Sequence, residues 1–250
     1  MLSSSSNAVV TGARSGIGLA ILDKFASKGI NVWAVIHRHD EGFLSHIEQL
    51  QREFKVWIKP LFMELSDPDS IKAGVKAIFQ EKRPIDILVN AAGIAGENRL
   101  FQMTPQEDIK RVFDINFHAP VLLTQLLSRV MVRQRSGCVI NIASIAGLDG
   151  NVQIAQMEYA ASKAALISAT QKMAFELGTN GVRVNAIAPG VIDTKMIDTM
   201  SQSIKQDAVS RTALGRLGKA GEIAEICYFL TLKEASFITG QTIRVDGGMM

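Results

Sequence analysis

The sequence predicts an α/β protein built as one doubly wound domain around a parallel sheet of about seven strands. Two observations support this fold class. Short apolar runs rich in β-branched residues alternate along the chain with longer stretches of helical periodicity, which is typical of strand–helix–strand units. The apolar runs are continuous rather than alternating with polar residues, so we expect helices on both faces of the sheet.

The expected elements follow one another in regular alternation. The expected strands are Ala8–Thr11, Asn31–Ile36, Val56–Leu61, Ile85–Asn90, Cys138–Ala143, Val182–Ala188 and Thr242–Val245. The expected helices are Ile17–Lys28, Leu44–Glu53, Asp69–Glu81, Gln106–Val132, Met157–Gly178 and Ala220–Leu230. No composition shift, linker or internal repeat marks a boundary, so residues 1–250 are expected to form a single domain. Residues 193–217 interrupt the alternation, and we expect either a substrate lid or a pair of surface helices there.

Composition narrows the classes of function. Hydrophobic residues make up 47% and charged residues 20% of 250 residues, which indicates a large buried core. A net charge of +3 without a basic tract argues against nucleic-acid binding. Cys138 and Cys227 lack metal-ligand spacing and stand in apolar stretches, so we expect buried thiols, no metal site and a reducing cytoplasm. No export signal or membrane-spanning run is expected.

The first expected strand runs directly into a glycine-rich turn and an amphipathic helix. The turn reads Thr11-Gly12-Ala13-Arg14-Ser15-Gly16-Ile17-Gly18. Glycines allow a tight turn and a close backbone approach to a pyrophosphate, which the free N–H groups of the following helix then bind. This position predicts a dinucleotide site in a Rossmann-type fold.

The end of the second strand predicts which dinucleotide binds. An acidic residue at this place bonds the ribose 2′-hydroxyl in NAD sites, but the chain here reads Ile36-His37-Arg38-His39. Arg38 can form a fork onto a 2′-phosphate, and Arg14 and Ser15 could close on the same group. NADP(H) is therefore the expected cofactor, with solvated loop residues as the alternative explanation.

A second group of residues predicts acid–base chemistry. Tyr159 and Lys163 are spaced i, i+4, so they lie on one helix face. A nearby ammonium, together with the positive charge of an oxidised nicotinamide, is expected to lower the pKa of the tyrosine and suit it to proton transfer. Ser144 ends the fifth strand, where α/β ligands bind, and its hydroxyl could orient a substrate carbonyl.

These motifs resemble the classical short-chain dehydrogenases/reductases over nearly the whole chain. The landmarks occur in order and are Thr11–Gly18, Asn90-Ala91-Ala92-Gly93, Asn116, Ser144, Tyr159/Lys163, Pro189-Gly190, Thr239-Gly240-Gln241 and Val245-Asp246-Gly247-Gly248.

The resemblance implies an oxidoreductase with a catalytic tetrad and a set of dinucleotide contacts. The tetrad comprises Asn116, Ser144, Tyr159 and Lys163, of which Ser144 and Tyr159 also contact the substrate. Lys163 is implied to hold the nicotinamide ribose as well, and Asn116 to prop a proton-relaying water. The implied cofactor-binding residues are Gly12, Arg14, Ser15, Gly16, Ile17, Gly18, His37, Arg38, Glu64, Leu65, Asn90, Gly93, Tyr159, Lys163, Pro189, Gly190, Ile192 and Thr194.

Two features depart from the family pattern. Ala91 replaces the second asparagine often seen in the Asn-Asn-Ala-Gly stretch. Ser144 and Tyr159 stand about two residues further apart than expected, with Val152–Met157 forming a longer substrate loop. The tetrad is unaffected, but the substrate is less well defined.

Within the family, Arg211–Gly218 and Ile238–Met250 resemble the 3-oxoacyl-[acyl-carrier-protein] reductases. That likeness implies an acyl-thioester substrate, an acyl carrier protein as partner and basic residues near the site, for which Arg129, Arg133 and Arg135 are candidates. Phe175 instead occupies a position that is often arginine in those enzymes.

The alternatives are a reductase of a sugar, small alcohol or secondary metabolite, and a non-catalytic dinucleotide sensor. The resemblance also implies a homotetramer, with the outer faces of the helices at 106–132 and 157–178 buried between subunits.

Overall fold

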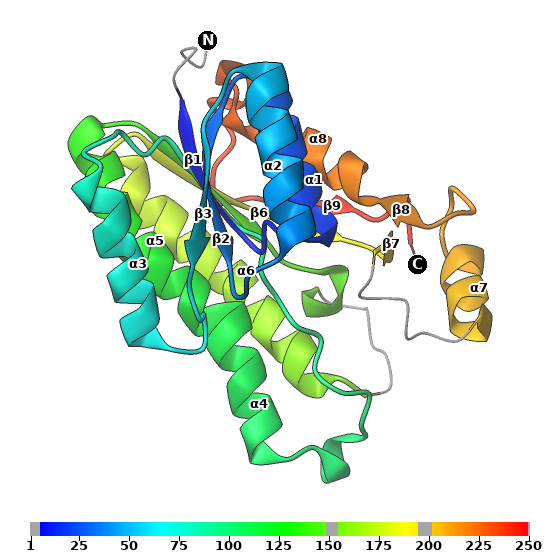
Figure 1. The fold of residues 1–250 in the computed structure, drawn as a ribbon. Coiled ribbons are helices and arrows are strands. Elements are labelled where there is room, and N and C mark those ends of the chain that lie inside the picture. Colours follow the sequence, from blue (N-terminus) through cyan, green and yellow to red (C-terminus); the bar gives the residue numbers. More distant parts are fainter. Residues whose placement is uncertain (1–5, 149–154, 195–201, 250) are drawn as a thin grey trace.

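The computed structural model describes residues 6–148, 155–194 and 202–249. Strands and helices alternate from the N-terminus, and an all-parallel sheet runs through the centre of the molecule (Figure 1). Its seven strands have the order β3-β2-β1-β4-β5-β6-β9. The strands are β1 (Asn7–Thr11), β2 (Asn31–Ile36), β3 (Ile58–Phe62), β4 (Ile87–Asn90), β5 (Gly137–Ile142), β6 (Val182–Pro189) and β9 (Thr242–Val245). The expected fold class is confirmed, with shifts of one or two residues at several strand ends.

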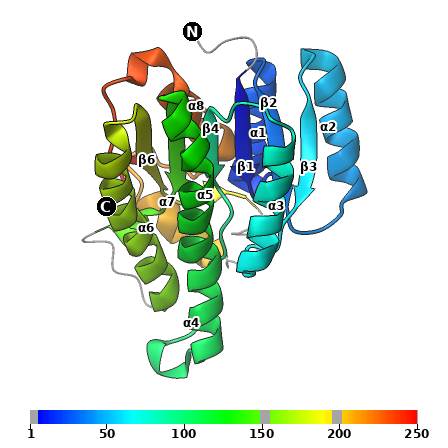
Figure 2. The same ribbon diagram turned by 90° about the vertical axis from the view of Figure 1, so that its left-hand side faces the viewer.

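Helices cover both faces of the sheet (Figure 2). They are α1 (Gly16–Ser27), α2 (Glu41–Phe54), α3 (Pro68–Gln80), α4 (Gln106–Phe113), α5 (Ala119–Gln134), α6 (Met157–Gly178), α7 (Gln202–Ser210) and α8 (Ala220–Thr231). One apolar core contains residues of α1, α2 and α8 and includes Ala8 and Val10 of β1. The other contains residues of α3, α5 and α6 and includes Val9. Successive residues of a strand thus enter different cores, which explains the continuous apolar runs.

The helix expected at 106–132 is interrupted. The structure has α4, then a π-helical turn at Asp114–His118, then α5. Pro120 explains part of this break, because proline has no N–H and Asn116 lies four residues before it. The carbonyl of Asn116 therefore lacks its ordinary helical donor. Such π-helical turns are frequent at functional sites.

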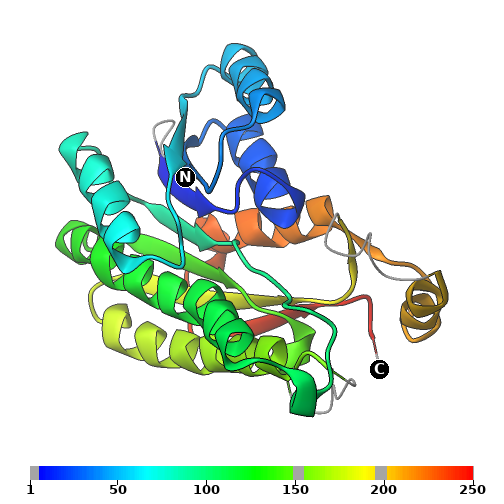
Figure 3. The ribbon, with the colours of Figure 1, turned by 60° about the horizontal axis from the view of Figure 1, so that its bottom comes forward.

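The segment at 193–217 is partly described. Two short strands, β7 (Ile192–Asp193) and β8 (Gly218–Lys219), pair in parallel at its ends. Between them α7 stands away from the main body, near the C-terminal end of the chain (Figures 1 and 3). Residues 195–201 lie outside the described part, so the expected lid stays a prediction. No helix in the described ranges is long and apolar enough to cross a membrane.

Candidate active site

The glycine turn lies at the carboxyl end of β1, next to the end of β4. The hydroxyl of Thr11 accepts hydrogen bonds from the N–H groups of Ala91 and Ala92, both at 3.0 Å. Gly12 has a φ of +67°, and a Cβ there would lie 2.9 Å from the Cα of Ala92. A Cβ on Gly18 would lie 2.2 Å from the carbonyl oxygen of Gly12. The turn therefore needs glycine at both positions.

The helix α1 begins directly after this turn. Ser15 precedes the helix in an extended conformation, and within the described residues its side chain caps no N–H group of α1. Gly16 has a φ of +56°, and a Cβ there would lie 3.6 Å from Thr194 at the end of β7. A side chain at position 190 would not fit easily, because a Cβ added to Gly190 would lie 2.8 Å from Asp246. The end of β7 thus lies beside a helix N-terminus suited to a pyrophosphate.

A cavity of about 70 Å³ lies beside the glycine turn, between the ends of β2 and β3. Its lining comprises Gly12, Arg14, Ser15, Val35, Ile36, His37, Met63, Leu65 and Ala92. The neighbouring Glu64 is exposed. Hydrogen bonds from the N–H and hydroxyl of Ser66 lower the pKa of the Glu64 carboxyl. Several of the expected cofactor-binding residues, among them Gly12, Ser15 and Leu65, therefore line one cavity.

Arg14 lies between this cavity and α2. It makes a salt bridge to Asp40 with an Nη1–Oδ2 distance of 2.9 Å. Asp40 also accepts a hydrogen bond from the N–H of Phe43 and caps α2. That bond, and next the bond from Arg14, lower the pKa of Asp40. Arg38 is exposed nearby. The sequence indicated Arg14 as a phosphate ligand but missed the carboxylate that binds it.

Ser144, Tyr159 and Lys163 meet at the carboxyl end of β5. Ser144 follows the strand and accepts a hydrogen bond from the N–H of Ala146 at 3.1 Å. Tyr159 lies in the first turn of α6, with its phenol beside Ser144. The Nζ of Lys163 lies 5.8 Å from the centre of the tyrosine ring and donates to the carbonyl of Ile142 at 2.8 Å. The spacing prediction for these three residues agrees with this arrangement.

The pKa of Tyr159 differs in direction from the sequence-based expectation. Burial raises it, and the hydrogen bond with Ser144 opposes that rise only in part. Burial also lowers the pKa of Lys163 to about 8. The protein's own residues therefore keep Tyr159 a neutral phenol at neutral pH, because both groups are desolvated. A neutral phenol is the form that can donate a proton.

Asn116 lies behind Lys163, in the π-helical turn. Its Nδ2 donates to the carbonyl of Ile94 at 2.9 Å and to the hydroxyl of Ser162 at 3.1 Å. Its Oδ1 accepts from the N–H of Ile94 at 2.9 Å. A Cβ on Gly93 would lie 3.3 Å from both Asn116 Oδ1 and Lys163 Nζ. Sequence reasoning missed Ile94 and Ser162, although Pro120 within the helical pattern signalled a break.

The side chain of Asn90, an expected cofactor contact, points into the protein. Its side chain is buried and donates to Asn141 at 2.8 Å and to Thr124 at 3.3 Å. Asn141 in turn donates to Thr170 of α6 at 2.8 Å. These bonds join neighbouring strands to the helices behind them. The Oδ1 of Asn90 is buried without a hydrogen-bond partner among the described residues, so the expected cofactor contact of Asn90 stays a prediction.

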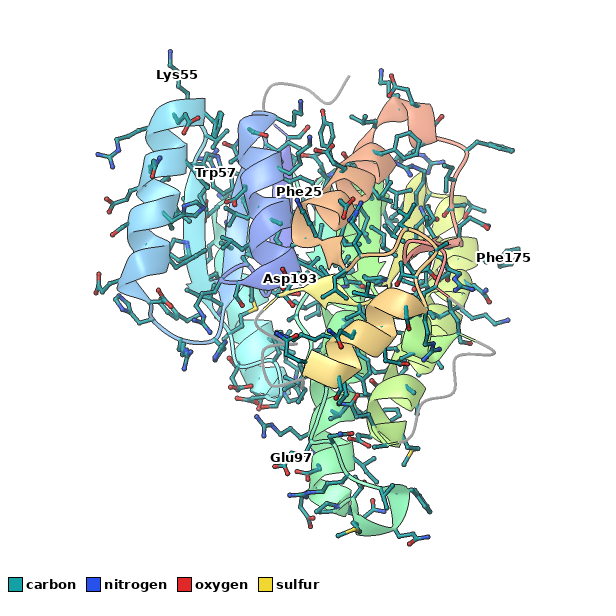
Figure 4. The ribbon with its side chains drawn as sticks, turned by 90° about the vertical axis from the view of Figure 1, so that its right-hand side faces the viewer. Phe25, Lys55, Trp57, Glu97, Phe175 and Asp193 are labelled. Atoms are coloured by element: carbon teal, nitrogen blue, oxygen red, sulfur yellow. The ribbon has the colours of Figure 1, made fainter. Side chains whose placement is uncertain are left out.

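Three other expectations concern the substrate side. Residues 152–154 of the loop expected at 152–157 lie outside the described part of the chain. Arg133 and Arg135 stand where α5 ends and β5 begins, which is the end of the sheet opposite Ser144 in the same chain. Phe175 is 85% exposed and projects away from α6 (Figure 4). Arg133 and Arg135 therefore do not lie beside Ser144 in this chain.

Comparisons with known proteins agree with this fold. A family model described as Enoyl-(Acyl carrier protein) reductase matches residues 12–250. The 3-oxoacyl-[acyl-carrier-protein] reductase of Thermotoga maritima is 37% identical over 97% of this chain and 96% of its own. The corresponding enzyme of Aquifex aeolicus is 38% identical over 96% of each chain. The chain belongs to the short-chain dehydrogenase/reductase family.

Two solved structures have the same fold. A 3-oxoacyl-[acyl-carrier protein] reductase from Brucella melitensis superposes with a TM-score of 0.87 at 32% identity, covering 98% of this chain and 91% of that one. A short-chain type dehydrogenase/reductase from Mycobacterium marinum gives a TM-score of 0.89 at 29% identity, covering 97% and 94%.

Proposed function

We propose that this protein is an NADPH-dependent reductase of 3-oxoacyl thioesters, acting as a 3-oxoacyl-[acyl-carrier-protein] reductase. The observation that carries the proposal is the half-buried Tyr159 phenol, which lies beside Ser144 at a strand end and is backed by Lys163. The curated relatives named for this reaction cover almost the entire chain. Residues 1–250 would then form one dinucleotide-binding catalytic domain.

The site residues fit a phosphorylated dinucleotide. Gly12 and Gly18 leave room for close backbone approach, and the first turn of α1 presents its N–H groups. Arg14 has a buried Nε without a hydrogen-bond partner in the described part of the chain, and it lines the cavity at the adenine side. We assign the cofactor contacts to Gly12, Arg14, Ser15, Gly16, Ile17, Gly18, His37, Arg38, Glu64, Leu65, Asn90, Gly93, Tyr159, Lys163, Pro189, Gly190, Ile192 and Thr194.

In the proposed mechanism the protein binds the cofactor, orients the substrate carbonyl and protonates the carbonyl oxygen. When bound, the reduced nicotinamide supplies the hydride that the carbonyl carbon accepts. Ser144 donates a hydrogen bond to the carbonyl oxygen and stabilises the charge that develops there. Tyr159 Oη transfers its proton to the same oxygen, which completes the alcohol.

Lys163 and Asn116 then restore the proton. The ammonium of Lys163 stabilises the phenolate that Tyr159 leaves behind. Lys163 then returns a proton to Tyr159, and a water held by the carbonyl of Asn116, which lacks its helical donor because of Pro120, can reprotonate Lys163.

Partners and surroundings belong to the same proposal. We propose that an acyl carrier protein delivers the substrate, that the enzyme works in the cytoplasm and that it is a homotetramer. The arginines at the end of α5 could reach a site mouth only from another subunit, because they lie opposite Ser144 in their own. Residues 193–217 would serve as a substrate lid over the site.

Substrate assays test the proposal directly. NADPH oxidation should be fastest with an acetoacetyl thioester, compared with crotonyl thioester, sugars and small ketones. Preference for crotonyl thioester would identify an enoyl reductase, matching the description of the family model. Preference for a sugar or ketone would identify a metabolite reductase, and binding without any turnover would identify a sensor. Sedimentation at working concentration tests the tetramer, and a monomer would exclude it.

A further inference from the structure

Asp40 joins the glycine turn to the N-terminus of α2. One carboxylate oxygen accepts the N–H of Phe43 at 2.9 Å and caps the helix. The other accepts from Nη1 of Arg14 at 2.9 Å. The two side chains are partly buried, with exposed fractions of 33% for Asp40 and 18% for Arg14. Asp40 therefore has two separable tasks, one as a helix cap and one as a counter-ion.

Arg14 uses only part of its donor capacity on Asp40. A guanidinium has five N–H donors in a fixed fork, and Nε of Arg14 is buried without a partner among the residues described. Arg14 also lines the cavity that His37 borders on another side. A buried donor left unbonded is costly. Because Asp40 accepts one N–H of Nη1, the only Arg14 side-chain bond among the described residues, Arg14 keeps further donors with which to bind an anion in the cavity that it lines.

We infer that Asp40 is a specificity-determining residue that weakens binding of the 2′-phosphorylated dinucleotide by sharing Arg14 with the phosphate. This inference rests on the proposed NADPH site. A 2′-phosphate and the Asp40 carboxylate have the same sign of charge and approach the same guanidinium. The Asp40 carboxylate offsets part of the positive charge of Arg14 and repels the phosphate. A dinucleotide with a free 2′-hydroxyl feels neither effect.

The substitution Asp40→Asn separates the counter-ion from the cap. The amide oxygen that it introduces can still accept the N–H of Phe43, since asparagine is as good an N-cap as aspartate, but the charge is gone. The matched control is Asp23→Asn. Asp23 of α1 pairs with His46 of α2 at 2.7 Å, so this variant also removes a charge that faces α2. Asp23 is not among the residues that line the cavity.

Binding titrations test the inference without turnover. Kd values for NADPH and NADH would be measured from nicotinamide fluorescence at about 150 mM salt, where distant charges are screened. For Asp40→Asn we expect the Kd of NADPH to fall about 3- to 5-fold, at the upper end of the range for partly exposed charge pairs. The Kd of NADH should change by less than about twofold, and Asp23→Asn should change neither value by more than that.

Fragments and a double variant add independent readouts. Adenosine 2′,5′-bisphosphate should show the same gain as NADPH in calorimetry, whereas AMP should not. In an Arg14→Gln background, the gain from Asp40→Asn should shrink, because the shared guanidinium is absent. An unchanged NADPH Kd in Asp40→Asn would overturn the inference. A raised NADPH Kd would also overturn it, because it would show that Asp40 instead positions Arg14 for the phosphate. Failure of the thioester assay would leave these titrations interpretable.

Discussion

Asn116 and Ile94 hold each other through a reciprocal pair of hydrogen bonds, both 2.9 Å long. The amide of the side chain satisfies the N–H and the C=O of the same residue, 22 positions earlier in the chain. A third bond from Asn116 reaches Ser162, whose hydroxyl donates to the carbonyl of Tyr159 at 2.8 Å. The loop after β4, the π-helical turn and the catalytic helix are thereby fixed to one another.

Replacing Asn116 should therefore impair stability and catalysis together. In Asn116→Ala the partly buried N–H and C=O of Ile94 lose their partner, and we expect the free energy of unfolding to fall by about 1–3 kcal/mol. The kcat should fall at least about tenfold because Lys163 and Tyr159 lose their support. Denaturant unfolding and steady-state kinetics measure the two effects. Ser162→Ala is the milder comparison, since it leaves both bonds to Ile94, and a silent Asn116→Ala would contradict the assignment.

Removing the phenol oxygen should abolish proton donation without emptying the cofactor site. For Tyr159→Phe we expect kcat to fall by about 10²–10⁴-fold, the usual contribution of a positioned general acid. The ring and the contacts of Lys163 remain, so the Kd of NADPH should stay within about threefold. Single-turnover kinetics and fluorescence titration give the two values. Carbonyl reduction at the wild-type rate in this variant would exclude Tyr159 as the proton donor.

Much of this arrangement follows from local sequence patterns. Continuous apolar runs predicted the strands, and the i, i+4 spacing of Tyr159 and Lys163 together with Ser144 at a strand end predicted the catalytic cluster. These inferences need only the period of a helix and the rule that ligands bind at the carboxyl ends of parallel strands.

Other features depend on contacts between distant positions. The Asn116–Ile94 pair, the salt bridge between Arg14 and Asp40 and the inward side chain of Asn90 join segments that no local period relates. The direction of the pKa of Tyr159 depends on how deeply the phenol is buried, which a sequence pattern does not specify.

Gly18 should tolerate no side chain, because its Cβ would meet the Gly12 carbonyl oxygen at 2.2 Å. We expect Gly18→Ala to displace the turn, reduce the free energy of unfolding by about 2 kcal/mol or more and weaken NADPH binding at least about tenfold. Gly221 is the matched control, because it also lies in the first turn of a helix and a Cβ there would meet nothing within 4 Å. Gly221→Ala should be neutral or stabilise by up to about 1 kcal/mol. Equal effects of the two substitutions would contradict the close-approach argument.

Because of Lys163, the free energy of unfolding should rise with pH, whereas a lysine in an ordinary ion pair makes it fall as pH rises. Its pKa is about 8 in the folded protein against an ordinary 10.5, so the unfolded chain binds more protons between these values and stability rises with pH across this interval. Below about pH 8 the buried ammonium costs about 3 kcal/mol.

Lys163→Met should accordingly raise the free energy of unfolding at pH 7 by about 1–3 kcal/mol, reduced by the lost bond to Ile142, while abolishing activity. The advantage should shrink as pH rises towards 10, because the wild-type lysine is then increasingly neutral in both states. Urea unfolding at pH 7, 8.5 and 10 measures this trend. Lys72→Met is the control, since Lys72 is an exposed partner of Asp69 whose pKa is raised; its effect should not lessen between pH 7 and 8.5. A constant difference between wild type and Lys163→Met at all three pH values would show that the folded protein does not depress the pKa of Lys163.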